Sequence, residues 1–366
     1  MKKIVEGEIL NKTIYIASIE ELAGKSFVTI PLALKIMEKG RKVGYFKPIG
    51  SASLINSQGF PMDEDVEFIK KLLNLKEEDK IICPIVLSET DFLKNFIGKN
   101  LKEYEEKIYD SFKEISREKD VILMEGGRTL STGAFINLCA PKLAKAFSSK
   151  FILIHQFKGD FLIDETVQAR DYCLNWGLKP YGVILNKVPQ EKIEFVNSVI
   201  KNFLNMHDLE LLGVIPENSI LNSLTVKEIY KKIDGKILAG EEGINNLVQT
   251  FLVGAMSVES SMKYFRKTIN KLIITGGDRT DLILAALETK ASGIILTGNL
   301  YPSIKVFPKA DELKIPLILV PYDTFTTLQL LQKIIGKTKL IDEERIKIAK
   351  QIFEENVDWK RIIEDL

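Results

Sequence analysis

The chain has 366 residues, of which 45% are apolar, so it is long enough for two or three domains with cores of their own. Its 51 basic and 50 acidic residues give a net charge of +1, which provides no overall field to attract nucleic acid or an anionic membrane. Glu6 and Glu8 follow the first lysines in place of an apolar signal segment, and no apolar run reaches ~18 residues. We therefore expect a cytoplasmic protein with neither nucleic acid nor a membrane as a partner.

The most informative stretch of the sequence is residues 12–35. An apolar run at residues 14–17 is followed by a polar turn, by Gly24, Lys25 and Ser26, and then by apolar residues at helical spacing. This order predicts a strand, a phosphate-binding loop and a helix. In such a loop the backbone N–H groups face the phosphates, Lys25 would reach the outer phosphates, and the Ser26 hydroxyl would bind Mg²⁺.

The tripeptide alone is weak evidence, because a second Gly-Lys-Thr sequence occurs at residues 336–338. That copy follows a helical pattern, and we interpret it as a helix end, where glycine is common. The first copy lies between a predicted strand and a predicted helix, but Ser18 or Ile19 stands where the motif's first glycine is expected. The alternative to nucleotide binding is therefore a structural turn.

Charged residues elsewhere would add to a phosphate site. Lys47 follows a predicted strand and would supply a second cation for the phosphates, although a solvated surface lysine is the alternative. Asp63 and Asp65 open an amphipathic helical pattern, where they would either cap the helix or hold Mg²⁺. Glu125 ends a continuous apolar run and is either an Mg²⁺ ligand at the carboxyl edge of a sheet or an ordinary strand end.

Apolar runs alternate with helical patterns along the first part of the chain, which predicts a doubly wound parallel α/β sheet. The predicted strands are residues 14–17, 42–46, 121–125, 151–155, 182–185 and 211–215. Asn186 follows one of these strands, at a place suited either to base recognition or to an ordinary turn. His155 and His207 are the only histidines, too few and too separated to predict a metal cluster or a catalytic triad.

The pattern changes near residue 225, where we place a boundary between domains 1–224 and 225–366. A second, smaller α/β domain is predicted from strands at residues 272–275, 293–297 and 317–320, followed by a charged amphipathic helix at residues 343–355. After the first of these strands, Asp278 fits a helix N-cap, and Arg279 would either bind a carboxylate or phosphate or pair with an acid. We expect the last helix to serve packing or dimer formation.

The sequence also resembles known families. Residues 12–218 resemble the P-loop group of dethiobiotin synthetases and cobyrinic acid diamide synthases through the segments SIEELAGKS, YFKPIG, MEGG, GVILNK and LGVIPEN. Residues 225–358 resemble a DRTGG domain through TVKEI, GAMSVESSMKYFR, ITGGDRTD, VPYDTFTT and ENVDW. In this order the two domains resemble the N-terminal regulatory half of long bacterial phosphotransacetylases.

The resemblance implies ATP and Mg²⁺ as ligands and a homodimer or larger assembly. It implies adenine recognition by Asn186. The residues that match phosphate and Mg²⁺ positions are Lys25, Ser26, Lys47 and Glu125, with either Asp63 or Asp65 as the acid that follows the Lys-Pro turn. Ser18 departs from the leading glycine of the loop.

The favoured hypothesis is an ATP- and Mg²⁺-binding regulatory or sensor protein, whose DRTGG-like domain binds a small metabolite near Asp278 and Arg279 or couples the nucleotide state to a partner. No acyltransferase domain follows residue 366, so transacetylase chemistry is not expected. The alternative is an enzyme of the dethiobiotin synthetase type, which activates a carboxylate or carbamate by phosphoryl transfer with Lys47 as a catalytic residue. A structural scaffold without a ligand is a third hypothesis, favoured only by Ser18.

Overall fold

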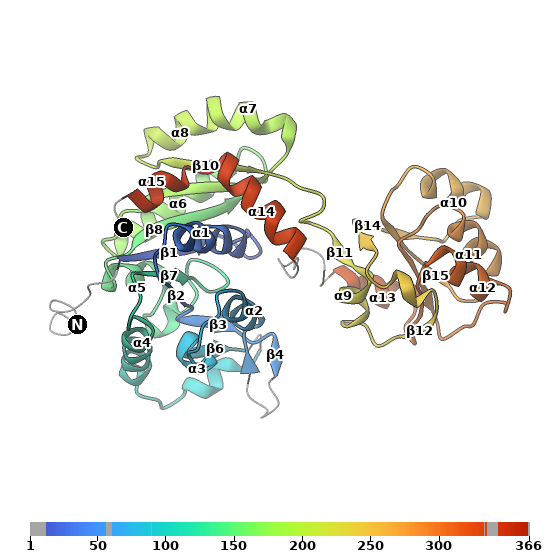
Figure 1. Cartoon of the computed structure of the whole chain (residues 1–366), viewed down its shortest axis with the longest axis horizontal. Helices are drawn as coiled ribbons and strands as arrows, with labels where there is room; N and C mark the ends of the chain where they lie inside the picture. The colour runs from blue at the N-terminus through green and yellow to red at the C-terminus, as the bar shows by residue number, and fades with distance from the viewer. Residues whose placement is uncertain (1–11, 56–60, 89, 333, 335–342, 365–366) are drawn as a thin grey trace. The chain divides into compact units, whose positions relative to one another are not determined.

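The computed structural model describes residues 12–55, 61–88, 90–332, 334 and 343–364. The chain divides into two compact units, one formed by Met1–Glu217 together with Leu340–Leu366 and the other by Asn218–Lys339 (Figure 1). No helix in the described ranges is both long enough and apolar enough to cross a lipid bilayer. The second Gly-Lys-Thr sequence, residues 336–338, lies outside the described residues, so its interpretation as a helix end stays a prediction.

A six-stranded sheet forms the centre of the first unit, in the order β10-β9-β8-β1-β7-β2, with every neighbouring pair parallel. All six predicted strands are confirmed. The strands are β1 Lys12–Ser18, β2 Val43–Phe46, β7 Val121–Glu125, β8 Lys150–Gln156, β9 Gly182–Val188 and β10 Leu211–Pro216. Strands such as β7 are buried along their whole length, which is why they read as continuous apolar runs.

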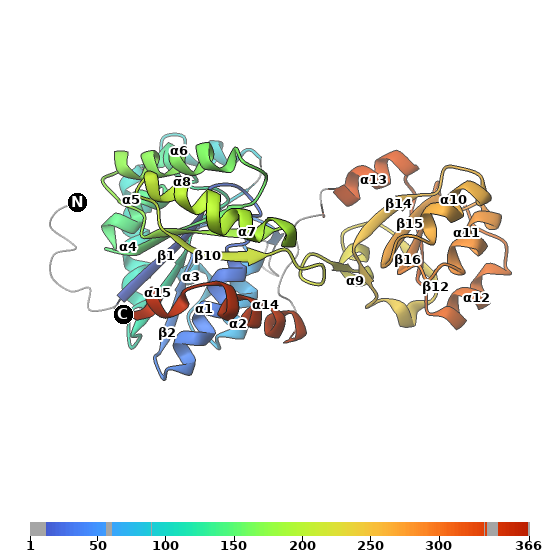
Figure 2. The same ribbon diagram turned by 90° about the horizontal axis from the view of Figure 1, so that it is seen from above.

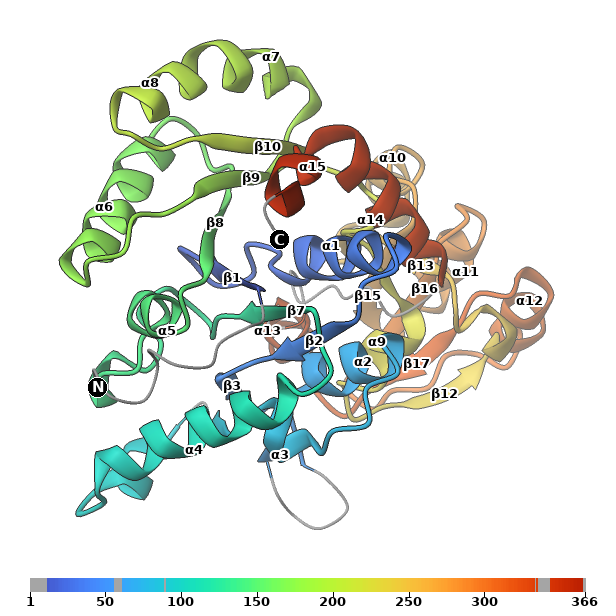
Figure 3. The same ribbon diagram turned by 60° about the vertical axis from the view of Figure 1, so that its left-hand side comes forward.

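Helices cover both faces of this sheet, and Figure 3 shows α1 and α14 on one face with α5 and α6 on the other. The positions of α1, α5 and α6 follow from right-handed crossovers, because the connection from β1 to β2 runs in one direction along the sheet and the later connections from β2 to β10 run in the other. The main helices are α1 Ser26–Glu38, α4 Leu101–Ile115, α5 Ala140–Ala146, α6 Leu162–Asn175, α7 Ile193–Phe195 and α8 Lys201–Met206, with a π-helical turn, η4 Val196–Ile200, between the last two. The predicted doubly wound α/β fold is confirmed.

A small subdomain separates β2 from α4 and carries residues of the candidate site. It contains two short strand pairs, β3 Ile49–Ser51 with β6 Ile85–Leu87 and β4 Leu54–Ile55 with β5 Pro61–Met62. Its helices are α2 Glu64–Leu72, α3 Asp79–Ile82 and η1 Phe92–Phe96. Two further short 3₁₀ turns of the first unit are η2 Ala134–Ile136 and η3 Gln190–Lys192.

The C-terminal helices α14 Glu343–Asn356 and α15 Trp359–Glu364 belong to the first unit. Helix α14 packs against α1 and β10, as Figures 1 and 2 show. Lys35 of α1 pairs with Glu354 at 3.1 Å, and its ammonium lies 4.7 Å from the ring centroid of Trp359. Assignment of the C-terminal helix to the second domain was therefore wrong. An amphipathic pattern indicates that one face is buried, but it does not indicate the surface that buries that face.

The second unit has a five-stranded sheet in the order β12-β17-β16-β15-β14, with β12 antiparallel and the rest parallel. Its strands are β12 Lys236–Ala239, β14 Thr250–Val253, β15 Lys271–Gly276, β16 Gly293–Thr297 and β17 Leu317–Leu319, and a small ribbon joins β11 Leu224–Thr225 to β13 Leu247–Val248. Its helices are α9 Val226–Tyr230, η5 Glu241–Gly243, α10 Val258–Phe265, α11 Thr280–Leu287, α12 Val306–Leu313 and α13 Thr324–Gln332. The three strands predicted here are confirmed, but the edge strands β12 and β14 were not predicted.

Alternate residues of this second sheet belong to two separate cores. Ile273 of β15 packs with residues of α11 and α12, whereas its neighbours Leu272 and Ile274 pack with residues of α9 and α13. A two-residue period with apolar side chains on both faces is the pattern of a sheet covered by helices on both sides. The prediction of a second, smaller α/β domain is confirmed.

We predict that Phe353→Ala lowers the free energy of unfolding of the first unit by about 3 kcal/mol, because Phe353 is a fully buried α14 side chain. Both tryptophans, Trp176 and Trp359, lie in that unit, so tryptophan fluorescence during denaturant unfolding measures its stability. The exposed α14 variant Lys347→Ala is the control and should change little. An equally small effect of both substitutions would contradict the packing of α14 on this unit.

Candidate functional site

The loop between β1 and α1 requires a glycine at residue 24. Gly24 has a φ of +94°, and a Cβ atom there would lie 2.1 Å from Asn186 Nδ2. The Asn186 side chain donates from Nδ2 to the Ala23 carbonyl oxygen at 2.7 Å and accepts from Lys187 N at 2.8 Å. Lys187 Nζ donates to the Leu22 carbonyl oxygen at 3.1 Å. The end of β9 therefore holds the backbone of this loop in place.

These contacts bear on the expected roles of two residues. Asn186 is buried, and its amide donor and acceptor are both bonded to the chain, so the structure shows it supporting the loop. Its assignment to adenine recognition stays a prediction. Lys187 follows Asn186 at the strand end that the sequence assigned either to base recognition or to an ordinary turn, and the structure shows it supporting the loop as well.

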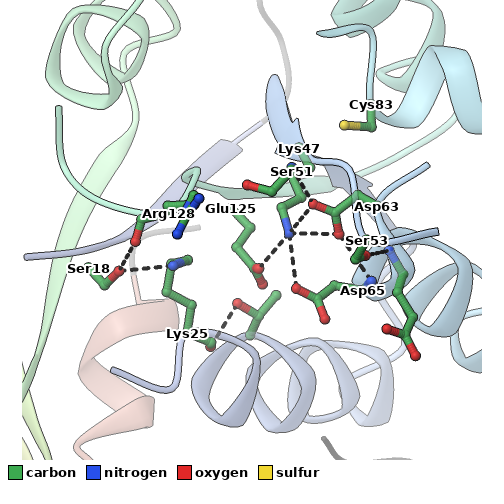
Figure 4. Close-up of polar contacts among 12 residues, drawn as sticks. Ser18, Lys25, Lys47, Ser51, Ser53, Asp63, Asp65, Cys83, Glu125 and Arg128 are labelled. Atoms are coloured by element: carbon green, nitrogen blue, oxygen red, sulfur yellow. Dashed lines mark hydrogen bonds and ion pairs between the residues drawn. The ribbon is translucent and has the colours of Figure 1, made fainter. Parts of the chain in front are cut away.

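Ser18, which departs from the expected glycine, contacts the lysine of the loop. Lys25 Nζ donates to Ser18 Oγ at 2.9 Å, and that hydroxyl is 3.4 Å from the Arg128 carbonyl oxygen (Figure 4). The Lys25 side chain thus folds back over its own loop. Burial lowers the pKa of Lys25, and the carboxylate of Glu125 opposes this effect only in part. Ser18 is a polar support for Lys25 as well as a departure from the motif.

Lys47 lies among three carboxylates. Its Nζ is 3.0 Å from Asp63, 3.1 Å from Asp65 and 3.5 Å from Glu125. Burial by itself would lower the pKa of Lys47, but the carboxylates of Asp65 and Asp63 outweigh burial and raise this pKa well above its ordinary value. Lys47 is therefore a buried cation, and its interpretation as a solvated surface lysine was wrong.

Asp63 fixes the start of α2. Its carboxylate accepts from Asp65 N at 3.0 Å and from Ser51 N at 2.8 Å, in addition to its contact with Lys47. The predicted helix-capping role of Asp63 is confirmed, and the backbone bonds leave it better suited to positioning Lys47 than to binding an ion. The side chain of Asp65 is 34% exposed and faces Lys47 from the first turn of α2. Its role as an Mg²⁺ ligand stays a prediction.

Glu125 is the least satisfied polar group of this cluster. Its side chain is 1% exposed, and neither carboxylate oxygen accepts a hydrogen bond from any residue that the structure describes. Burial raises the pKa of Glu125, and Lys47 opposes this effect. Figure 4 shows the side chain between Lys25 and Lys47. A second cation beside Lys47 would satisfy this buried carboxylate, and carboxylate and hydroxyl oxygens are the ligands that Mg²⁺ prefers. The roles of Glu125, Asp65 and Ser26 as Mg²⁺ ligands stay predictions.

The two candidate residues of the second unit have ordinary structural contacts. Helix α11 begins after Arg279, which occupies the N-cap position without a side-chain bond to the helix, so the prediction that Asp278 caps this helix was wrong. Arg279 Nη2 donates to the Met256 carbonyl oxygen at 3.2 Å, and its Nε lies 3.5 Å from Asp281. Pairing with an acid was one of the alternatives for Arg279. Ligand binding by Asp278 and Arg279 stays a prediction.

A glycine-containing phosphate loop between a central parallel strand and a helix, with a lysine and strand-end carboxylates beside it, defines a P-loop nucleotide-binding domain. Residues 12–225 match the AAA domain family AAA_26, and residues 228–334 match the DRTGG domain. The chain belongs to the AAA_26 family, whose match covers more than half of it. The predicted combination of a P-loop domain and a DRTGG domain is confirmed.

Curated relatives align with nearly the whole of this chain over about half of their own length. The phosphate acetyltransferase of Synechocystis sp. is 24% identical over 368 residues, which cover 97% of this chain and 52% of that protein. The phosphate acetyltransferase of Pseudomonas aeruginosa is 26% identical over 377 residues, which cover 95% of this chain and 51% of that protein. The chain therefore spans about half the length of these relatives.

Two solved structures each resemble a part of this chain. A plasmid partition protein from Borrelia burgdorferi, bound to AMPPNP, is 18% identical with a TM-score of 0.39, covering 58% of this chain and 89% of that one. The CBS and DRTGG domains of a Clostridium perfringens pyrophosphatase, complexed with diadenosine tetraphosphate, are 18% identical with a TM-score of 0.29, covering 46% of this chain and 86% of that one. TM-scores this low support no statement about function.

We predict that Gly24→Ala destabilises the first unit by about 1–2 kcal/mol more than Gly40→Ala does. Both glycines have a positive φ, but a Cβ at Gly40 meets no atom within 4 Å, whereas one at Gly24 displaces the hydrogen-bonded amide of Asn186. Tryptophan fluorescence during denaturant unfolding measures the difference. Equal losses in the two variants would show that Asn186 does not constrain the loop.

We predict that Glu125→Gln stabilises the metal-free protein relative to wild type, and increasingly so as the pH rises from about 4. The native pKa of Glu125 is raised, so the native state binds its proton more strongly than the unfolded state does. Ionisation of Glu125 therefore lowers the stability of the wild type as the pH rises from the unfolded pKa of this residue through its native pKa. The glutamine variant lacks this contribution. Urea unfolding with a chelator across this pH range tests the prediction. Glu106→Gln, at an exposed position of α4, is the control. A stability difference between Glu125→Gln and wild type that stays constant with pH would contradict a raised native pKa of Glu125.

Proposed function

We propose that this chain is a nucleotide-dependent regulatory protein of the phosphotransacetylase N-terminal type, which binds ATP with Mg²⁺ in its first unit. The observation that carries the proposal is the buried Glu125 carboxylate at the end of β7, which accepts no hydrogen bond from the described residues and lies beside Lys25 and Lys47. A cation bound there, together with phosphates on the two lysines, would satisfy every charge of the cluster.

Different residues of the chain would bind the phosphates and the Mg²⁺ ion. Lys25 would release Ser18 and reach the outer phosphates, while the backbone N–H groups at the start of α1 would face the inner ones. Mg²⁺, held by Ser26, Asp65 and Glu125, would neutralise phosphate charge. Asp63 would keep Lys47 at the edge of this site through its bonds to Ser51 N and Asp65 N.

Regulation is proposed because this chain combines a P-loop domain with a DRTGG domain, the combination that resembles the N-terminal regulatory half of phosphotransacetylases. The DRTGG domain would then pass the nucleotide state to a partner or bind a small metabolite at Asp278 and Arg279. We also propose that the protein is cytoplasmic. As the resemblance to the dethiobiotin synthetase group implies, it would act as a homodimer or larger assembly.

We predict micromolar binding of ATP in the presence of Mg²⁺, weakened by about tenfold or more in Lys25→Ala and in Glu125→Gln. Isothermal titration with ATP and with an analogue that has no cleavable γ-phosphate measures this. The exposed first-unit variant Lys42→Ala is the control and should bind like the wild type. Absence of binding to the wild type would reject the proposal, and unchanged binding in Lys25→Ala would reject this loop as the site.

A second candidate function is a ligase of the dethiobiotin synthetase type, and the observation that favours it is the charged, buried Lys47 beside strand-end carboxylates. Lys47 would stabilise the charge on a transferring phosphoryl group. Phosphate release that a small carboxylate or diamine stimulates, and that Lys47→Gln abolishes, would favour the enzyme. A nucleotide that binds with no such stimulation across a metabolite panel would favour the regulatory protein.

A further inference from the structure

A second group of potential ligands lies on the other side of the P-loop strand, outside the site described above. It consists of Glu20 in the loop after β1, His155 near the end of β8, and Glu165 in the first turn of α6. One ligand atom from each lies within 4.8 Å of the others. His155 Nε2 is 2.8 Å from Glu165 Oε2 and 3.8 Å from Glu20 Oε1. The sequence did not predict this group, because its members come from three separate segments and include only one histidine.

The hydrogen bonds of Thr166 favour one tautomer of His155. Thr166 Oγ1 donates to the Leu162 carbonyl oxygen at 2.6 Å. With this hydrogen used, the same oxygen accepts from His155 Nδ1, which lies 2.9 Å away. A neutral imidazole with its proton on Nδ1 has a lone pair on Nε2. In this tautomer the lone pair and the oxygens of Glu165 and Glu20 form a set of three potential metal ligands.

A metal ion between these three atoms would satisfy the Nε2 lone pair and both carboxylates. His155 is completely buried. Glu20 accepts from Gln156 N at 3.0 Å through one oxygen and pairs with Lys158 through the other. We propose that a divalent transition metal ion of the zinc class binds between His155 Nε2, Glu165 and Glu20.

The distances and ligand types suit such an ion. Zinc bonds to nitrogen and oxygen of roughly 2.0–2.1 Å separate tetrahedral ligand atoms by about 3.3 Å, and the two separations at Nε2 lie on either side of that value. One imidazole with two carboxylates selects a transition ion over Mg²⁺, which prefers oxygen ligands alone. The Glu165 side chain is 51% exposed, so water can reach the fourth position. Thr166 supports the metal-binding tautomer, as the outer partners of metal-bound histidines do.

The position of Glu20 gives the ion a structural consequence. Glu20 lies in the P-loop between Ser18 and Lys25, whereas His155 and Glu165 lie on β8 and α6. A bound ion would join the first part of the loop to these two elements. This inference does not depend on the proposed nucleotide function, because its ligands are separate from Glu125 and Asp65.

Zinc binding by the full chain, measured by equilibrium dialysis and elemental analysis with excess Mg²⁺ and no nucleotide, tests the proposal. We expect one tightly bound zinc per wild-type chain and about tenfold or more weaker binding in Glu165→Gln. Asp164→Asn changes the neighbouring exposed acid of the same helical turn and should bind like the wild type. Glu125→Gln should also retain zinc, which separates this ion from one bound at the phosphate site.

A second pair of variants tests Glu20, the proposed metal ligand in the loop. Glu20→Gln should weaken zinc binding, whereas Glu21→Gln, which alters the next loop residue and its pair with Arg128 at 2.7 Å, should not. Wild-type protein that binds no zinc under these conditions would overturn the proposal. Zinc binding that is equal in Glu165→Gln and Asp164→Asn would overturn it as well, because the ion would then lie elsewhere. Neither result would bear on ATP binding.

Discussion

One buried ammonium group determines the arrangement at the carboxyl edge of the first unit's sheet. Lys47 follows the end of β2 and meets carboxylates from the start of α2 and from the end of β7. Removing one partner of a buried ion pair costs about 3–5 kcal/mol, because the remaining charge is left without water or a counterion. Lys47 and Asp63, which are both buried, therefore require each other, and their pair holds the segment between β2 and α2 by charge as well as by apolar packing.

The same cluster has an uneven balance of charge. Two ammonium groups, on Lys25 and Lys47, face three carboxylates, on Asp63, Asp65 and Glu125. With all five groups ionised the cluster has one excess negative charge, and a divalent cation would reverse that sign. An anion would then be attracted where the metal-free cluster repels it. This balance explains physically why a phosphate ligand and Mg²⁺ would bind together more readily than either alone.

The sequence predicted those features that depend on local patterns. Fully buried parallel strands read as apolar runs, and a glycine and lysine between such a run and a helix indicate a phosphate loop, so the sheet and the positions of Lys25 and Glu125 could be predicted. The edge strands β12 and β14 are only partly buried along much of their length, which removes the apolar run that marks a strand. The role of Asn186 and the meeting of Glu20 with His155 arise from contacts between distant segments. No local pattern encodes such contacts.

The placement of α14 and α15 makes the first unit discontinuous in sequence, with the whole of Asn218–Lys339 inserted between its two parts. Gly213 of β10 forms a β-bridge with Val357, and a Cβ at that glycine would lie 2.7 Å from the Val357 side chain. The lack of a side chain at Gly213 therefore allows the segment after α14 to pack against β10. During synthesis the whole of the second unit is translated before α14. The nucleotide-binding domain therefore receives the helix that packs on α1 and β10 only after the inserted domain has been made. The domain that begins first in the sequence is in this respect the last to receive all of its residues.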